Sequence, residues 1–521
     1  MYAGLKIFVF GLVACGLLGT QNTYAEEVQY LSNIEHFAKC FAKLTDNPPD
    51  PTSDLYKQVQ QNKINAVDAC MSVFDTAMFN PSNRRLKNPS DPISKAIVQN
   101  FHRFHLSWLT VPYSQNIDGS VFSLLDNDEP ALYVTDTLFM NRPYKYVVTA
   151  DKSLRGVRES ANPETYMINN INFTNRVLAV GPMKTAAQEP DPLKNYFEIK
   201  GTRVSLGPLI GIQNTPSYVY DLPFAQKSEI PISEAQLPSR RLEATKYDIN
   251  VHPGGGILGS STTFLNSRES LVMPDGGLYV HRRYSNNFFY DFMCSKLPTF
   301  KDSDPLVAAE LKRFEKSEIS FRKSATCVAC HLTLDNFAHA SRNVISNRGL
   351  PPGFNRDLQT AGLQATNFEI VNHYTPVKDD LAEPVDKDPL YHRRQPDGRL
   401  VYRNYAGKVV NVKVRGIPAL GAAVASQDDI YMCAAKRYYN FLTGVTVPLD
   451  PITLDSKTKK PADPSDNFAF FHRQKIVSLG ASLKKGEDAS GNTWSLRNLV
   501  REVIKSDAFR AKNPALVGDS L

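Results

Sequence analysis

Apolar residues recur at helical spacing in the first part of this chain. In residues 28–45 they follow one another at intervals of three or four positions, which predicts an amphipathic helix. Residues 64–79 show the same periodicity, and a third apolar stripe runs from Pro92 to Trp108. We therefore expect a helical N-terminal domain over residues 26–115.

The pattern changes in residues 116–250, where no helical stripe is evident. Short β-rich runs at Ala131–Thr135, Tyr144–Thr149 and Arg203–Ile212 lie among Asn, Pro and Asp turn signals. We expect an irregular, β-containing middle region.

The C-terminal half is helical again from about Gly256. Ile430–Leu442 is a predicted helix that Gly444 ends, and Trp494–Phe509 is the last clear helix. Residues 345–425 look loop-rich, with Pro396-Asp397-Gly398 as one of the turns. The fold class predicted for the whole chain is mainly α.

The pentapeptide Cys327-Val328-Ala329-Cys330-His331 reads C-x-x-C-H, the sequence that attaches c-type haem. Two thiols three residues apart project from one face of a helical turn, so both can bond the vinyl groups of one porphyrin. The imidazole of His331 is then the proximal iron ligand. An apolar pattern continues after the motif, so we expect the pentapeptide to begin a helix. The predicted cofactor is one covalent haem c.

Other uses of this pentapeptide fit less well. A structural zinc site needs four ligands, and the chain has no second C-x-x-C and no H-x-x-x-H. A thioredoxin-like pair should follow a strand, whereas the residues before the motif are charged and polar.

We expect residues 251–450 to form a cytochrome c-like haem domain that residues 451–521 complete. A methionine or second histidine as sixth ligand would give an electron carrier, and an open position would permit peroxide or small-molecule chemistry. Met432 and His281 are the two leading candidates for the distal ligand. The other candidates in the sequence are Met273, Met293, His339, His373, His392 and His472.

Residues 1–25 read as a signal peptide. Lys6 precedes the apolar run Ile7–Leu18, which is too short to span a bilayer, and small residues lead to a cleavage position after Ala25. An alternative is a lipobox, in which Cys15 becomes an acylated N-terminus and a lipid anchor. We therefore expect a periplasmic or exported protein, or alternatively an outer-membrane lipoprotein. No later segment predicts a transmembrane helix.

Export makes disulfides possible. Apart from Cys15 and the two haem cysteines, the chain has Cys40, Cys70, Cys294 and Cys433, which allow three pairings. Cys40 and Cys70 lie on neighbouring predicted helices and are the natural local pair, which leaves Cys294 for Cys433. The alternative is that some are buried free thiols.

Two further features of the sequence bear on ligand binding. His102 and His105 stand three residues apart, as metal ligands can, but they also flank an aromatic stripe that would hold them as core residues. The chain has 60 Lys and Arg against 53 Asp and Glu, a net charge of +7 over 521 residues. That excess does not indicate nucleic acid as a partner, and an acidic redox partner protein is compatible with it.

The order of several motifs resembles that of the large c-type cytochromes first noted in planctomycetes, which are mostly uncharacterised. The motifs on which the resemblance rests are Gly255–Ser261, Tyr279–Arg283, Phe292–Pro298, the C-x-x-C-H pentapeptide, Cys433–Gly444, Ser495–Val500 and Lys505–Arg510. The chain departs from that family in having Asp335-Asn336 where Asp-Pro is usual, and Arg283 where glycine is expected. The resemblance implies a haem protein of the bacterial envelope with no settled reaction.

These observations predict an electron-transfer cytochrome that works with redox partner proteins in the envelope. The alternatives are a haem-dependent oxidoreductase or peroxidase-like enzyme with an open sixth iron position, and a module in which haem mainly stabilises the fold. No catalytic acid or base is identified from the sequence.

Overall fold

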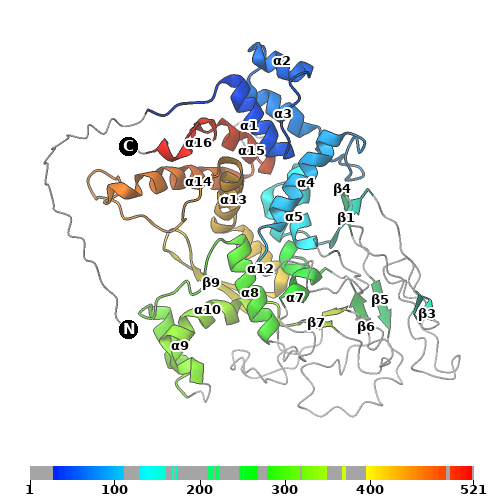
Figure 1. Cartoon of the computed structure of the whole chain (residues 1–521). Coiled ribbons are helices and arrows are strands. Elements are labelled where there is room, and N and C mark those ends of the chain that lie inside the picture. Colours follow the sequence, from blue (N-terminus) through cyan, green and yellow to red (C-terminus); the bar gives the residue numbers. More distant parts are fainter. Residues whose placement is uncertain are drawn as a thin grey trace, which may run out of the picture.

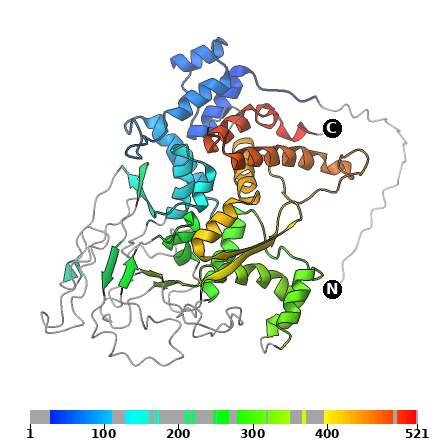
Figure 2. The same ribbon diagram turned by 180° about the vertical axis from the view of Figure 1, so that it is seen from behind.

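A computed structural model of the chain is shown in Figures 1 and 2. The structure describes residues 27–110, 126, 128–159, 167–168, 171–172, 208–214, 218–221, 246–249, 252–267, 278–316, 320–348, 366–370, 395–487 and 493–518. The predicted signal peptide and Cys15 lie outside these residues.

The N-terminal region is helical, as the apolar periodicity predicts. Its helices are α1 (Asn33–Thr45), α2 (Asp54–Gln60), α3 (Ala66–Asp75) and α4 (Pro92–Leu106). A polar residue precedes each one and accepts a hydrogen bond from a backbone N–H of the first turn; these residues are Ser32, Ser53, Asn65 and Asp91. The mainly α fold class is confirmed.

The two ends of the chain pack together. The C-terminal helices are α13 (Asp429–Thr443), α14 (Asn467–Lys485), α15 (Leu496–Lys505) and α16 (Asp507–Arg510). Figures 1 and 2 both show the first helices beside the last ones. Nε2 of His36 lies 3.0 Å from the carbonyl oxygen of Ile504, and Nζ of Lys39 donates to the carbonyl of Phe509 at 2.7 Å. One cluster of buried apolar side chains extends from Phe37 to Phe509.

Two of the expected strands are helical instead. Ala131–Thr135 lies inside α5 (Glu129–Phe139), and Tyr144–Thr149 overlaps the 3₁₀ helix η1 (Tyr144–Val148). Every residue of α5 is buried, so the helix has no exposed face, and periodicity cannot distinguish such a run from a buried strand.

The strands that do form make two-stranded antiparallel sheets. The end of the Arg203–Ile212 run belongs to β4 (Leu209–Asn214), which pairs with β1 (Leu154–Arg158). The other pairs are β2 (Met167–Ile168) with β3 (Ile171–Asn172), β5 (Tyr218–Asp221) with β6 (Lys246–Ile249), β7 (Val344–Arg348) with β8 (Thr366–Ile370), and β9 (Asp397–Arg403) with β10 (Val409–Arg415).

The end of the segment expected to be loop-rich is regular. The β9–β10 hairpin and helix α12 (Gly416–Ala425) occupy it, so the turn expected at Pro396-Asp397-Gly398 is wrong. Gly398 is a strand residue that lies against the end of α10 (Ala325–His339). A Cβ atom there would lie 2.5 Å from the backbone nitrogen of Ala340, so only glycine lets the hairpin approach this closely.

Helix α10 carries the C-x-x-C-H motif and packs among α8 (Leu278–Phe292), α9 (Pro305–Arg313) and strand β9. The shorter elements of this part are η3 (Gly256–Gly259), α7 (Ser261–Asn266) and η4 (Ser320–Lys323), and the C-terminal part adds η6 (Pro464–Asp466) and η7 (Pro514–Leu516). Gly444 ends α13 with a φ of 80°, as predicted.

Both predicted disulfides are present. Cys40–Cys70 joins α1 to α3, and Cys294–Cys433 joins the segment that follows α8 to α13. Their Cα–Cα distances are 6.3 and 5.2 Å. Among the helices that the structure describes, none combines the length and apolar character that a membrane crossing requires.

Candidate functional site

The C-x-x-C-H motif lies in the first half of α10. The hydroxyl of Ser324 accepts a hydrogen bond from the backbone N–H of Cys327 and starts the helix there, which confirms the expected helix start. Cys327 and Cys330 are both partly exposed and form no disulfide. Their spacing puts both thiols on one face of the helix, where one planar group can reach both.

His331 is oriented by a carboxylate one turn further along α10. Its Nδ1 lies 3.3 Å from each carboxylate oxygen of Asp335, and the ring of Phe321 stacks on the imidazole at 4.3 Å between centroids. The side chain of His331 is 23% exposed. A histidine whose Nδ1 donates to a carboxylate keeps Nε2 as the nitrogen that can bind a metal, which is the usual arrangement of metal-binding histidines.

Two arginines hold Asp335 in place. Nε of Arg282, from α8, donates to it at 2.6 Å, and Arg322, from η4, donates at 2.9 Å. The side chain of Asp335 is only 3% exposed. Burial alone raises the pKa of this carboxyl, but hydrogen bonds from His331 and Arg282 outweigh burial and hold its pKa below the usual range. Asp335 is therefore a buried, ionised acceptor behind His331.

The Cys330 thiol is not activated as a nucleophile. Burial, the charge of Asp335 and the neighbouring Cys327 raise its pKa, whereas a nucleophilic cysteine needs a thiolate. Within the described ranges no group of three or more His, Cys, Asp or Glu side chains is placed to hold a metal ion. A haem c needs one histidine for its iron and two thiols for attachment, and His331, Cys327 and Cys330 fit these roles.

The two leading distal-ligand candidates lie on other elements. Met432 is buried in the interface between α13 and α14, where a Cβ on Gly480 would lie 3.0 Å from its Cγ. His281 is buried on α8, and its Nδ1 lies 2.8 Å from the hydroxyl of Ser341, just beyond α10. The structure thus brings His281, but not Met432, into contact with the segment that carries the motif.

The remaining candidates are dispersed. His339 is two turns beyond His331 on α10, and burial and the charge of Arg342 lower its pKa to about 3. Met293 is buried after α8, and Nδ1 of His472 lies 2.7 Å from the hydroxyl of Tyr439. Met273, His373 and His392 lie outside the described residues. The identity of the sixth ligand stays a prediction.

His102 and His105 point their ring nitrogens at protein groups. Both Nδ1 atoms lie within 3.2 Å of the hydroxyl of Thr135, and the Nε2 atoms lie near Asp128 and Tyr438 respectively. This is the geometry of core histidines in a hydrogen-bonded chain.

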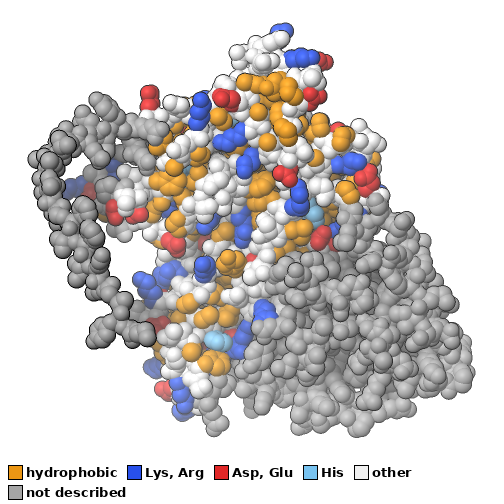
Figure 3. All heavy atoms as spheres, viewed as in Figure 1, with side chains coloured by type: hydrophobic (Ala, Val, Ile, Leu, Met, Phe, Trp, Pro, Cys, Tyr) orange, Lys and Arg blue, Asp and Glu red, His pale blue; other side chains and the backbone are white. Residues whose placement is uncertain are grey.

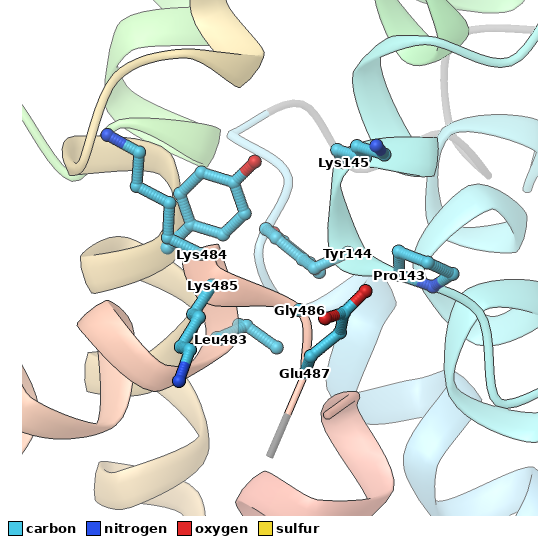
Figure 4. A pocket seen from close by; sticks show the side chains of 9 residues that line it. Pro143, Tyr144, Lys145, Leu483, Lys484, Lys485, Gly486 and Glu487 are labelled. Carbon is cyan, nitrogen blue, oxygen red and sulfur yellow. The ribbon is translucent and has the colours of Figure 1, made fainter. Parts of the chain in front are cut away.

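A small open pocket of about 120 Å³ lies elsewhere, between η1 and the C-terminal end of α14 (Figure 4). Tyr144, Leu483 and Glu487 are among its lining residues, and Lys484 on its rim pairs with Asp428 at 2.6 Å. No residue of the C-x-x-C-H motif lines it, so it is not part of the candidate site.

Several site residues were not identified as such from the sequence. Asp335 stood out only as a departure from a family pattern, although its position four residues after His331 puts the two on one helix face. Arg282 lies in one of the motifs of the family resemblance, Tyr279–Arg283, but that motif assigns it no role. Phe321 and Arg322 gave no signal, because their contacts with α10 depend on the fold.

The chain matches no family model, no curated protein and no solved structure. The resemblance to planctomycete-type c-type cytochromes therefore stays a prediction, and the functional argument rests on the geometry around α10.

Proposed function

We propose that this chain binds one haem c through Cys327, Cys330 and His331 and transfers electrons in the bacterial envelope. One observation carries the proposal. His331 directly follows two partly exposed thiols on one helix and has its Nδ1 on a buried carboxylate, so that Nε2 is the nitrogen left for the iron.

Each residue has a distinct part in holding the group. Cys327 and Cys330 would each hold haem through a thioether bond to one of its two vinyl groups, with each S–H added across a double bond so that no oxidant would be needed. Asp335 fixes the imidazole tautomer of His331, and the stacked ring of Phe321 fixes its orientation. When bound, haem supplies an iron that gains and loses one electron.

The envelope location and a protein redox partner belong to the same proposal. The two disulfides support an oxidising compartment, and the predicted signal peptide supports export to the periplasm. On the face drawn in Figure 3, Lys and Arg side chains are interspersed with Asp and Glu side chains. Among the residues that Figure 3 colours, the two signs are mixed, so the net charge of +7 alone does not define the docking surface.

The test is covalent haem attachment. The exported chain is expressed with c-type haem maturation machinery, separated on a denaturing gel and stained for haem. We expect a haem band that disappears when Cys327→Ala and Cys330→Ala are combined. The control replaces the same number of cysteines in the Cys40–Cys70 disulfide by serine and keeps the band. A band that survives in the Cys327/Cys330 variant contradicts the proposal.

A second candidate is a haem-dependent oxidoreductase with an open sixth position. The carboxylate of Asp335 favours it, because a proximal histidine that donates to a carboxylate becomes a stronger electron donor to its metal. The reduced optical spectrum with and without carbon monoxide separates the two candidates. A low-spin spectrum that carbon monoxide does not change indicates two protein ligands and electron transfer. A shifted spectrum indicates an open or labile position.

A further inference from the structure

A buried tyrosine–histidine pair lies in the core away from the haem motif. Tyr438 on α13 is fully buried, and its hydroxyl lies 2.7 Å from Nε2 of His105 on α4. The ring of Trp108 lies 5.9 Å from the ring of Tyr438 and 5.5 Å from that of His105. Three side chains that can take part in redox or proton chemistry thus meet in the protein interior, with the guanidinium of Arg437 5.3 Å from the Trp108 ring.

The hydrogen bonds fix where the protons are. The hydroxyl of Thr135 donates to the carbonyl oxygen of Ala131 at 2.9 Å, so its oxygen is left as an acceptor for the imidazole of His105. Nδ1 of His105 lies 2.9 Å away and donates to it, whereas His102 directs its Nε2 hydrogen at the carboxylate of Asp128, 3.1 Å away. A neutral His105 then has no hydrogen on Nε2, and that nitrogen accepts the phenolic hydrogen of Tyr438.

The charge states agree with this assignment. Burial and the neighbouring His102 lower the pKa of His105 well below its usual value, which keeps the imidazole neutral. Burial raises the pKa of Tyr438 well above its usual value. The proton therefore stays on the phenol as long as the tyrosine is reduced.

A row of aromatic rings leads from Tyr438 to the motif helix. Trp108 lies 6.2 Å from Phe292 on α8, Phe292 stacks on Phe288 at 5.7 Å, and Phe288 stacks on Phe337 of α10 at 5.4 Å. Each distance joins ring centroids and lies within the range of direct ring contact. The pair is thus joined by packed rings to the helix that carries Cys327, Cys330 and His331.

We propose that Tyr438 and His105 form a proton-coupled redox site in which Tyr438 gives up one electron while its phenolic proton moves to Nε2 of His105. The products are a neutral tyrosyl radical and a histidine imidazolium. The electron goes to a strong one-electron, metal-centred oxidant, whose metal is reduced by one unit. Re-reduction of the radical returns the proton to the phenol oxygen, so atoms and charges balance over the cycle.

The geometry explains why oxidation is possible at Tyr438 and not at Tyr431. A phenol that loses an electron becomes a very strong acid, and the site supplies a base at hydrogen-bond distance in advance. Tyr431 is a buried tyrosine on the same helix, but its hydroxyl donates to the backbone carbonyl of Ala425 at 2.7 Å. A carbonyl oxygen cannot take up the proton. Ferric haem is too weak an oxidant for this step, so the redox site requires a strong one-electron oxidant and does not rest on the proposed function.

The experiment generates tris(bipyridine)ruthenium(III) by flash photolysis with the full mature chain and records electron paramagnetic resonance spectra. We expect a persistent neutral tyrosyl radical whose formation slows in deuterium oxide. Tyr438→Phe and His105→Gln should each abolish it, because glutamine keeps an acceptor but cannot hold the extra proton. Tyr431→Phe is the matched control and should leave it unchanged. His105→Gln remains informative if Tyr438→Phe does not fold.

Two results would overturn the proposal. One is a wild-type chain that gives no persistent radical. The other is a radical that survives in folded Tyr438→Phe or His105→Gln, or that is lost instead in Tyr439→Phe, which removes the neighbouring Tyr439–His472 hydrogen bond. Because the oxidant is external, these results do not depend on haem. Failure of haem attachment in the gel test is therefore distinguishable from failure of the tyrosine site.

Discussion

Replacing Asp335 by Asn tests whether a buried carboxylate tunes the proposed haem. The substitution keeps the shape of the side chain and removes its charge. In the wild-type chain that charge lies 3.3 Å from Nδ1 of His331, and the side chain is 3% exposed, so water screens it little. A charged acceptor strengthens electron donation by the histidine and stabilises ferric over ferrous iron.

The magnitude follows from the change in hydrogen-bond type. A hydrogen bond to a charged group contributes about 1.5–3 kcal/mol, and one between neutral groups about 0.5–1.5 kcal/mol. The difference is about 1–1.5 kcal/mol, close to a tenfold change in the ferric-to-ferrous ratio. For one electron a tenfold change corresponds to about 59 mV. We therefore expect the midpoint potential of Asp335→Asn to lie roughly 60 mV above that of the wild type.

The assay is a spectroelectrochemical titration of both proteins, with Asp136→Asn as the matched control. Asp136 is fully buried and lies between Arg84 at 2.7 Å and Arg142 at 3.1 Å, but it contacts no metal-ligand candidate. Either substitution leaves two arginines without their carboxylate and should cost about 3–5 kcal/mol of stability. Only Asp335→Asn should move the potential. Equal shifts in the two variants, or none in Asp335→Asn, would refute the reasoning.

Three further predictions concern stability. Replacing Cys294 and Cys433 by serine should lower the free energy of unfolding by up to about 5 kcal/mol, and the same change at Cys40–Cys70 by about 3.5 kcal/mol. The two values differ because the disulfides close loops of 139 and 30 residues. Chemical denaturation that gives the reverse order would contradict this. Burial raises the pKa of Asp291 to about 6. Between about pH 4 and pH 6 the folded state therefore holds a proton that the unfolded state has released, so the free energy of unfolding falls as the pH rises through this range. Asp291→Asn should therefore gain up to about 3 kcal/mol relative to wild type between pH 4 and pH 7, and a pH-independent difference in urea denaturation would count against it. Gly398→Ala should lower the free energy of unfolding by about 1–3 kcal/mol, because its Cβ meets the backbone of Ala340, and an unchanged melting temperature would show that β9 can shift.

The sequence predicted the parts of the fold that one element determines by itself. The N-terminal helices have one apolar face and a polar N-cap, and α13 ends at Gly444, so periodicity and capping residues suffice for them. Helix α5 has no exposed face, because α4, β1 and η1 pack against it, and the sequence resembles a strand there. The β9–β10 hairpin was missed for a different reason. Its Pro-Asp-Gly start is typical of a turn, and only the position of α10 shows why a glycine is needed in the strand.

The candidate site also has one part that the sequence predicts and one part that depends on the fold. The spacing of Cys327, Cys330 and His331 is local, and the sequence alone predicts their placement on one helix. The environment of His331 is not local, because Arg282 comes from α8, 53 residues before Asp335, and Arg322 comes from η4. Asp335 stays ionised because hydrogen bonds from His331 and Arg282 outweigh the cost of its burial, since an unpaired buried carboxylate would take up a proton. Whether His331 donates to a charged or a neutral acceptor thus depends on helix packing. The electron donation of His331 to the proposed haem iron is therefore set by residues that belong to no haem-binding motif.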